Sequence, residues 1–231
     1  MENRFGVIGL GRFGTTIART LSARGAEVMA IDNDADKVDA LRDEVAYAVQ
    51  LDSTDIKALR SQNVHELDGV VVAIGQDFEA LLLTTVQLLE LKVKRIIARA
   101  SNEQQRRILM KLGVEEVLSP EDEVGISVAG RLLNPDLVSF FQLPDDYQIV
   151  ELRTPVGVTS KTVIEIGLRN KYNLNLITLR RAYEITNDDG EKTTEYHILG
   201  VPSSDTVLYE SDYIILLGKN TDIERFVDLN K

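Results

Sequence analysis

Short apolar runs alternate with longer amphipathic stretches over the first 134 residues of the chain. Six runs rich in Val, Ile and Ala are bounded by Gly, Asp or Ser and predict buried β-strands: FGVIG, EVMAID, AYAVQLD, GVVVAIG, RIIARA and EEVLS. Helical patterns separate them, and FEALLLTTVQLLEL at residues 78–91 places its apolar side chains on one helical face. Strict β–α alternation predicts a Rossmann-like, doubly wound parallel sheet over residues 1–134.

Two of the predicted helices have recognisable starts. Ser101 and Gln104 fit a capping box that opens a helix after the fifth strand. Ser119 precedes Pro120 and two acids, an order typical of a helix N-terminus. Nucleotides bind beyond the carboxyl ends of such strands, so the residues around these ends matter for function.

The pattern changes after residue 134. Residues 135–146 contain two prolines and several acids, and they predict a linker or crossover. Beyond it, QIVELRTP, LNLITLRRAYEIT, TTEYHILG and DTVLYESDYIILLG predict strands, SKTVIEIGLRNKY predicts a helix, and Asp189-Gly190 marks a hairpin turn. A last helix is expected from residues 221–224 on. Residues 147–231 therefore predict a small α+β domain, too small for the usual catalytic half of a dehydrogenase.

The loop GVIGLGRFGTT joins the first strand to the first helix and contains G-x-G-x-x-G at Gly9, Gly11 and Gly14. This context indicates a nucleotide-binding loop. Gly9 permits the tight turn, Gly11 lets a pyrophosphate approach the backbone, and Gly14 lets the helix pack close to the sheet. The helix N-terminus offers N–H groups and partial positive charge to the phosphates.

Asp32 and Arg12 extend this prediction. Asp32 ends the second strand, where a carboxylate accepts hydrogen bonds from both ribose hydroxyls of an adenosine and repels a 2′-phosphate, which disfavours NADP. Arg12 lies inside the loop, and its guanidinium would favour a terminal triphosphate. The alternatives are an ordinary surface arginine and a degenerate Rossmann fold with an empty groove.

Other candidate binding residues follow the ends of the later strands: Asp52, Ser53, Ala73, Ile74, Gly75 and Arg99. Asp52 or Ser53 would approach an adenine edge, and capping of the next helix is an equally weighted alternative. The small or apolar residues from Ala73 to Gly75 allow a ligand to lie across them, although Gly75 also suits a plain turn. Arg99 would add positive charge, or serve as a surface ion-pair partner.

The amino-acid composition excludes or disfavours several classes of function. The chain has 231 residues with 44% hydrophobic and 27% charged residues, a net charge of −11 and no cysteine. This excludes disulfides and thiolate chemistry, and the acidic balance argues against a nucleic-acid partner, which needs a basic stripe. No apolar run has the roughly 18 residues that span a bilayer, and no signal-peptide layout opens the chain, so we expect a soluble protein.

Catalytic residues are hard to find. The two histidines, His65 and His197, are most simply explained as a surface turn and a structural strand residue, and neither G-x-S-x-G nor H-E-x-x-H occurs. Hydride transfer needs an acid or base near a nicotinamide, usually on a second domain. We therefore expect no enzyme, and a second domain that senses a ligand or regulates.

The motifs taken together carry a family resemblance. GLGRFG with Asp32, then LDSTD, AIGQD and LSPEDEVG followed by a short α+β unit, resemble the RCK/KTN (TrkA-N/TrkA-C) family. More narrowly, the chain is similar over essentially its whole length to the single-copy regulatory subunit of Ktr/Trk-type bacterial potassium-uptake systems.

The resemblance implies a function. Such subunits bind ATP, ADP or NAD(H) in the N-terminal domain, form homodimers that assemble into an octameric ring, and dock on the cytoplasmic face of a membrane potassium-translocating subunit. Nucleotide exchange changes the ring's shape and gates transport. The GLGRFG residues Arg12 and Phe13 belong to this site, with Arg12 meeting the ATP phosphates across the dimer interface. Glu121 would help to bind Mg²⁺ or Ca²⁺, or else only favour a helix N-terminus.

The resemblance also covers the second domain. In relatives this domain dimerises, and in some it binds cyclic di-AMP, which would implicate Arg169, Asn175 and Pro202. Two alternatives stay open: an NAD-dependent oxidoreductase, and a nucleotide-sensing regulator of another transporter.

Overall fold

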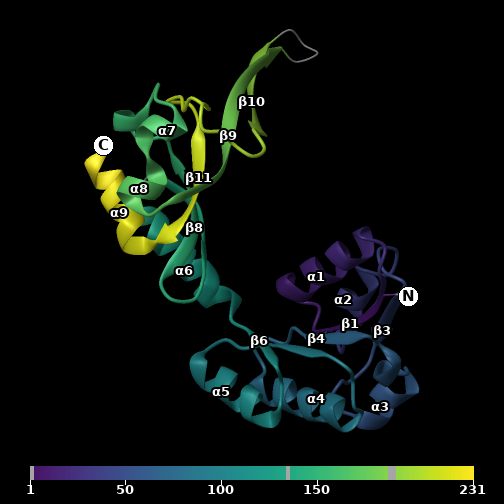
Figure 1. The fold of residues 1–231 in the computed structure, drawn as a ribbon. Helices are drawn as coiled ribbons and strands as arrows, with labels where there is room; N and C mark the ends of the chain where they lie inside the picture. Colours follow the sequence, from purple (N-terminus) through teal and green to yellow (C-terminus); the bar gives the residue numbers. More distant parts are fainter. Residues whose placement is uncertain (1–2, 134–135, 187–190) are drawn as a thin grey trace. The chain divides into compact units, whose positions relative to one another are not determined.

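The computed structural model describes residues 3–133, 136–186 and 191–231 (Figure 1). The expected hairpin turn at Asp189-Gly190 lies outside the described residues. Contacts between residues divide the chain into two compact units, Met1–Glu123 and Val124–Lys231. Each unit has its own sheet and is described by itself.

The first unit is built on the predicted parallel sheet. Its strands are β1 (Arg4–Ile8), β2 (Glu27–Asp32), β3 (Tyr47–Gln50), β4 (Gly69–Val72), β5 (Ile96–Arg99) and β6 (Glu116–Leu118). They follow the order β3-β2-β1-β4-β5-β6, and all five pairings are parallel. The strand order reverses between β1 and β4, which creates the crevice where this fold class binds ligands. The predicted Rossmann-like fold is confirmed.

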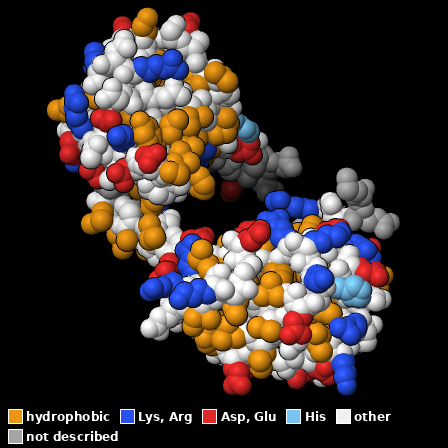
Figure 2. Space-filling model, turned by 60° about the horizontal axis from the view of Figure 1, so that its bottom comes forward, with side chains coloured by type: hydrophobic (Ala, Val, Ile, Leu, Met, Phe, Trp, Pro, Cys, Tyr) orange, Lys and Arg blue, Asp and Glu red, His pale blue; other side chains and the backbone are white. Residues whose placement is uncertain are grey.

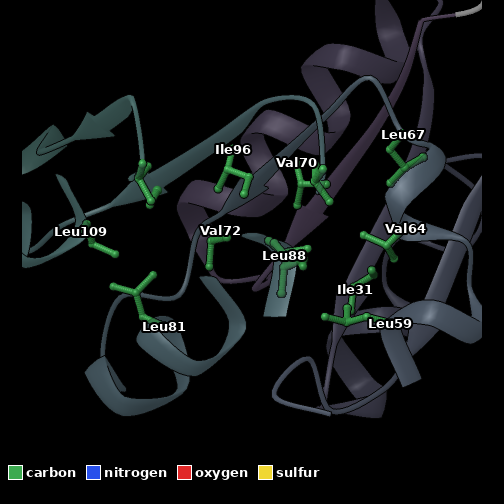
Figure 3. Packing of buried hydrophobic residues seen from close by; sticks show 14 of the residues in the cluster. Ile31, Leu59, Val64, Leu67, Val70, Val72, Leu81, Leu88, Ile96 and Leu109 are labelled. Atoms are coloured by element: carbon green, nitrogen blue, oxygen red, sulfur yellow. The ribbon is translucent and has the colours of Figure 1, made fainter. Parts of the chain in front are cut away.

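Helices cover both faces of this sheet (Figure 1). They are α1 (Arg12–Ala23), α2 (Ala35–Asp39), α3 (Ile56–Ser61), α4 (Phe78–Glu90) and α5 (Glu103–Leu112), with a 3₁₀ turn at Val64–Glu66. Buried side chains from α1 and α2 pack on one face, and those from α3, α4 and α5 pack on the other. Figure 3 shows the second cluster, in which Leu81 and Leu88 of α4 face Val70 and Val72 of β4.

Side-chain caps fix where these helices begin. Asp34, Asp55 and Asp77 each accept a hydrogen bond from a backbone N–H in the first turn of the helix that follows. For α5 the cap is Asn102, whose Oδ1 accepts from the Gln105 N–H at 3.0 Å. The predicted Ser101–Gln104 capping box is therefore wrong by one residue; Ser101 donates its backbone N–H to Gln105 Oε1 instead.

Helix α6 (Pro120–Leu133) begins directly after Ser119, as predicted. It starts in the first unit and continues into the second. None of its side chains is buried. Its exposed large apolar side chains are Val124, Ile126, Val128, Leu132 and Leu133.

The second unit has a five-stranded antiparallel sheet. Its strands are β7 (Leu137–Gln142), β8 (Tyr147–Arg153), β9 (Asn175–Thr186), β10 (Lys192–Ile198) and β11 (Tyr213–Lys219), in the order β10-β9-β11-β8-β7. The helices are α7 (Val163–Ile166), α8 (Leu168–Tyr172) and α9 (Asn220–Leu229), with a 3₁₀ turn at Val156–Val158. Their buried side chains and those of the sheet form one core. The expected small α+β domain is confirmed.

Two details differ from the sequence prediction. Residues 137–142, expected within a linker, form the edge strand β7, because Phe140 packs against the second core and the backbone pairs with β8. The single helix predicted over SKTVIEIGLRNKY is two short helices. Gly167 separates them with a φ of +69°, a conformation that ends α7 and that glycine adopts without strain.

The surface mixes side-chain types. On the face shown in Figure 2, both units carry Lys and Arg, acidic and hydrophobic side chains, and the hydrophobic ones gather in patches. Among the described residues, no helix combines the length and the apolar character that crossing a membrane requires.

Candidate nucleotide-binding site

A cavity of about 470 Å³ lies at the carboxyl ends of the parallel strands, where the strand order reverses. This volume is typical of small-molecule sites, which span about 300–1,000 Å³. Most of the predicted residues line it: Gly9, Gly11, Arg12, Asp32, Asp52, Ser53, Ala73, Ile74, Gly75 and Arg99. The structure thus brings together the ends of five strands that are far apart in sequence.

The three glycines have three different environments. Gly9 has a φ of +95°, which makes the tight turn after β1. A Cβ on Gly14 would lie 1.9 Å from the Gly9 carbonyl oxygen, so this position keeps α1 close to β1. A Cβ on Gly11 would meet nothing within 4 Å, because the space beside it is the open cavity. These are the conformations that a phosphate-binding loop requires.

The N-terminus of α1 borders the cavity, and its free N–H groups have no side-chain partner there. No side chain caps this helix, and its first turn contains no acid. The first N–H groups of a helix have no intrahelical acceptor, and the helix dipole adds partial positive charge there. Arg12, exposed in the first turn, adds a full charge. The loop therefore fits the phosphates of a nucleotide.

Asp32 is held rigidly at the end of β2 and is only 8% exposed. Its Oδ2 accepts from the Leu10 N–H at 2.7 Å, and its Oδ1 accepts from the Asp34 N–H at 2.9 Å. Each carboxylate oxygen has a second lone pair, so the group can still accept from two ribose hydroxyls. Lys37 Nζ lies 3.6 Å from Asp32 Oδ1 and balances part of the charge.

Asp52 and Ser53 line the cavity, and neither caps α3, whose cap is Asp55. Asp52 Oδ1 accepts from the hydroxyl and then from the backbone N–H of Thr54, and these two bonds, the hydroxyl's first, lower the pKa of this carboxyl below its ordinary value. Ser53 is buried, and its hydroxyl lies 2.7 Å from that of Thr84. The capping alternative is thus wrong, and Asp52 faces the cavity as a carboxylate.

The β4 and β5 side of the cavity carries Arg99. Its guanidinium lies 5.6 Å from the centre of the Phe13 ring and forms an ion pair with Glu121. A Cβ on Gly75 would lie 2.5 Å from Arg99 Nη1, so glycine leaves room for this side chain. Phe13 is not among the cavity-lining residues; its place in the structure is against Arg99.

Sequence reasoning missed part of the lining: Ile8, Asn33, Lys37, Thr54, Gln76, Asp77 and Ala80. Asn33, Thr54 and Gln76 each directly follow a predicted position, Ile8 directly precedes one, and Asp77 lies two residues after Gly75, so proximity to a strand end was the available signal for these five. Lys37 and Ala80 are the exceptions, because they reach the cavity from α2 and α4.

Glu121 has a partner other than a metal ion. Among the described residues, no cluster of three or more His, Cys, Asp or Glu side chains has a geometry that could hold a cation. Among the residues that the structure describes, Glu121 is paired with Arg99 and has no further acidic or histidine side chains grouped around it.

The candidates in the second unit lie together. Arg169, Asn175 and Pro202 line a shared cavity of about 360 Å³. Arg169 donates to Asn175 Oδ1 from Nε and Nη2, at 3.1 and 2.7 Å. His65 and His197 line neither this cavity nor the one in the first unit.

Fold and site define a Rossmann-type ligand-binding domain joined to a small α+β domain. A family model described as "TrkA-N domain" matches residues 5–120. The Ktr system potassium uptake protein C of Bacillus subtilis is 32% identical over 98% of this chain and 96% of its own length. The chain therefore belongs to the TrkA-N family, and the resemblance inferred from its motifs is confirmed.

Solved structures agree on the fold. The GsuK channel bound to NAD matches all of this chain with a TM-score of 0.64 at 19% identity, and this chain spans 39% of that one. GsuK bound to ADP matches 58% of this chain with a TM-score of 0.50 at 27% identity, over 34% of its own length.

Proposed function

We propose that this chain is a nucleotide-sensing regulatory subunit that gates a membrane potassium-uptake system from the cytoplasmic side. The observation that carries the proposal is the cavity in the first unit, which is lined by the uncapped N-terminus of α1, by the Asp32 carboxylate and by Gly11, beside which no atom lies within 4 Å of an added Cβ. The names of relatives support the rest: one is a Ktr potassium uptake protein, and a channel of the same fold is bound to NAD or ADP.

The ligand is an adenine nucleotide: ATP, ADP or NAD(H). Asp32 would accept the ribose hydroxyls, and the loop from Gly9 to Gly14 would hold the phosphates. ATP and ADP differ in the γ-phosphate, and Arg12 is the exposed cation beside the loop that would contact it. A 100-fold difference in affinity between two conformations would shift their balance by about 2.7 kcal/mol per site.

Gating would act through an assembly. We propose homodimers that form an octameric ring against a membrane potassium-translocating subunit. The large exposed apolar side chains of α6 are unusual for a protein working alone, since no side chain of this helix is buried within the chain. In the second unit, cyclic di-AMP is the proposed ligand of the cavity at Arg169, Asn175 and Pro202. Mg²⁺ or Ca²⁺ at Glu121 stays a prediction, and such a site would need ligands beyond the described part of this chain.

The first experiment compares ATP and ADP. Isothermal titration calorimetry should show that Arg12→Ala lowers the ratio of ATP to ADP affinity, because only ATP carries the γ-phosphate. Arg24→Ala at the opposite end of α1 is the matched control and should leave the ratio unchanged. An unchanged ratio in Arg12→Ala would refute the role of this residue.

The second experiment tests regulation against catalysis. Small-angle scattering of the full chain should give different particle dimensions with ATP and with ADP. Incubation with NADH and a panel of carbonyl compounds should leave the NADH absorbance constant. Steady NADH oxidation would instead favour the oxidoreductase alternative. Identical scattering with ATP and with ADP would refute the proposed change of shape on nucleotide exchange.

A further inference from the structure

Arg99 and Glu121 connect the cavity of the first unit to helix α6. Arg99 is the last residue of β5 and lines the cavity, whereas Glu121 lies in the first turn of α6. Their side chains form an ion pair in which Arg99 is 20% exposed and Glu121 is 57% exposed. The pair thus has one member at the cavity and the other on the helix that continues into the second unit.

Arg99 is positioned by its neighbours and retains donor capacity. The Phe13 ring lies against its guanidinium, and Gly75 leaves space at Nη1. Its Nε is buried and has no hydrogen-bond partner among the described residues. A buried N–H without an acceptor is costly, so the present arrangement leaves one donor of Arg99 unused.

The strand order places Arg99 near the phosphate end of a nucleotide. The glycine loop follows β1 at the centre of the sheet, and Asp32 ends β2 on one side of it. Arg99 ends β5, which lies beyond β4 on the opposite side. With the ribose on Asp32 and the first phosphate on the loop, groups beyond that phosphate extend toward Arg99.

We propose that the distal phosphate of the bound nucleotide and the Glu121 carboxylate compete for the Arg99 guanidinium. The ion pair then links β5 to α6, and a bound phosphate breaks this link by displacing the Glu121 carboxylate from Arg99. This inference rests on the proposed nucleotide binding and adds how the site signals to α6. A phosphate is a strong, bidentate partner for arginine, whereas an ion pair with an exposed member is weak, so exchange favours the phosphate.

Competition has a measurable consequence for affinity. The pair reduces the fraction of chains in which Arg99 is available, and apparent affinity falls with that fraction. Removing the Glu121 charge should therefore tighten nucleotide binding. The strength of an exposed ion pair corresponds to roughly a twofold to fivefold effect. Linkage is reciprocal, so bound nucleotide must weaken the Arg99–Glu121 ion pair by the same factor.

Calorimetry in EDTA tests this without any contribution from divalent cations. Glu121→Gln should tighten ATP about twofold to fivefold and leave AMP, which lacks distal phosphates, unchanged. Glu123→Gln removes the same charge from the same helical turn and is the matched control for long-range electrostatics. In an Arg99→Gln background, Glu121→Gln should have no effect on ATP.

Hydrogen exchange gives a second readout on the wild-type chain. ATP should speed exchange of backbone amides in the first turns of α6, and Arg99→Gln should abolish that response. The competition is refuted if Glu121→Gln weakens ATP, if it matches Glu123→Gln, or if its effect survives in Arg99→Gln. A wild-type chain that binds no nucleotide would overturn the proposed function itself, which is a different result from normal binding without competition.

Discussion

Gly11, the N-cap of α1, and Gly14, in its first turn, stand three residues apart, yet replacing each with alanine should damage a different property. A Cβ on Gly14 would lie 1.9 Å from the Gly9 carbonyl oxygen, a backbone atom that cannot rotate away. Helix α1 must then move from β1, and overpacking of this kind costs about 1–3 kcal/mol, with the upper end expected here. For a unit of this size, about 3 kcal/mol corresponds to a fall in melting temperature of roughly 10 °C.

Gly11→Ala should leave stability nearly unchanged. Gly11 has a φ of −70°, which alanine adopts, and a Cβ there meets no atom within 4 Å. Replacing glycine at the N-cap destabilises the helix, whereas alanine lowers the entropy of the unfolded chain and so stabilises the fold, and the two effects roughly offset each other. The methyl group would instead hold a phosphate away from the backbone. Losing a charge-assisted hydrogen bond costs about 1.5–3 kcal/mol, or about a 10- to 150-fold weaker ATP affinity.

Urea denaturation followed by circular dichroism and ATP titration by calorimetry check both expectations on the same two variants. Gly14→Ala should lower the free energy of unfolding of the first unit, whereas Gly11→Ala should lower ATP affinity alone. The reasoning is refuted if Gly11→Ala binds ATP like the wild type, or if Gly14→Ala is as stable as the wild type.

Three further predictions follow from single side chains. Asp32→Asn keeps the size but replaces one acceptor oxygen with a donor, so calorimetry should show at least about 10-fold weaker ATP binding, the value of one charged hydrogen bond; equal affinity would exclude Asp32 from the site. Asp212 is fully buried and accepts two bonds from Arg181, at 2.9 and 2.7 Å, so Asp212→Ala should destabilise the second unit by about 3 kcal/mol in urea denaturation. Thr54→Val removes a hydroxyl that lowers the Asp52 pKa, so NMR titration should find this pKa raised. The stability from a depressed carboxyl pKa is present above the unfolded value of about 3.9 and is lost as the pH falls through the folded value. The part of the difference in unfolding free energy between Thr54→Val and the wild type that comes from this pKa should therefore be present at neutral pH and vanish in acid.

Much of the first unit follows from local patterns. The six apolar runs became the six strands because parallel strands buried on both faces read as continuous Val and Ile runs. Gly9, Gly11 and Gly14 each have the environment expected for them, since a nucleotide loop imposes a different backbone demand at each position. Strand ends also located most of the cavity lining, because the carboxyl ends of parallel strands lie at one edge of the sheet.

The remaining features depend on contacts that local patterns do not contain. Ser101 and Asn102 are both good caps, and the tertiary position of α5 decides between them. Residues 137–142 contain polar and apolar side chains like a linker, but pairing with β8 and burial of Phe140 make them a strand. The Arg99–Glu121 pair joins β5 to α6 across 22 positions of sequence and depends on how both elements are placed in the fold.

Native mass spectrometry of the purified full chain shows whether the protein binds a nucleotide and releases it unaltered. We expect an adenine nucleotide bound to the wild-type chain and released with its mass unchanged, together with loss of that nucleotide in Gly11→Ala at unchanged oligomer size. A wild-type chain that carries no nucleotide after incubation with ATP, ADP or NADH, or that returns the nucleotide chemically altered, would contradict this expectation.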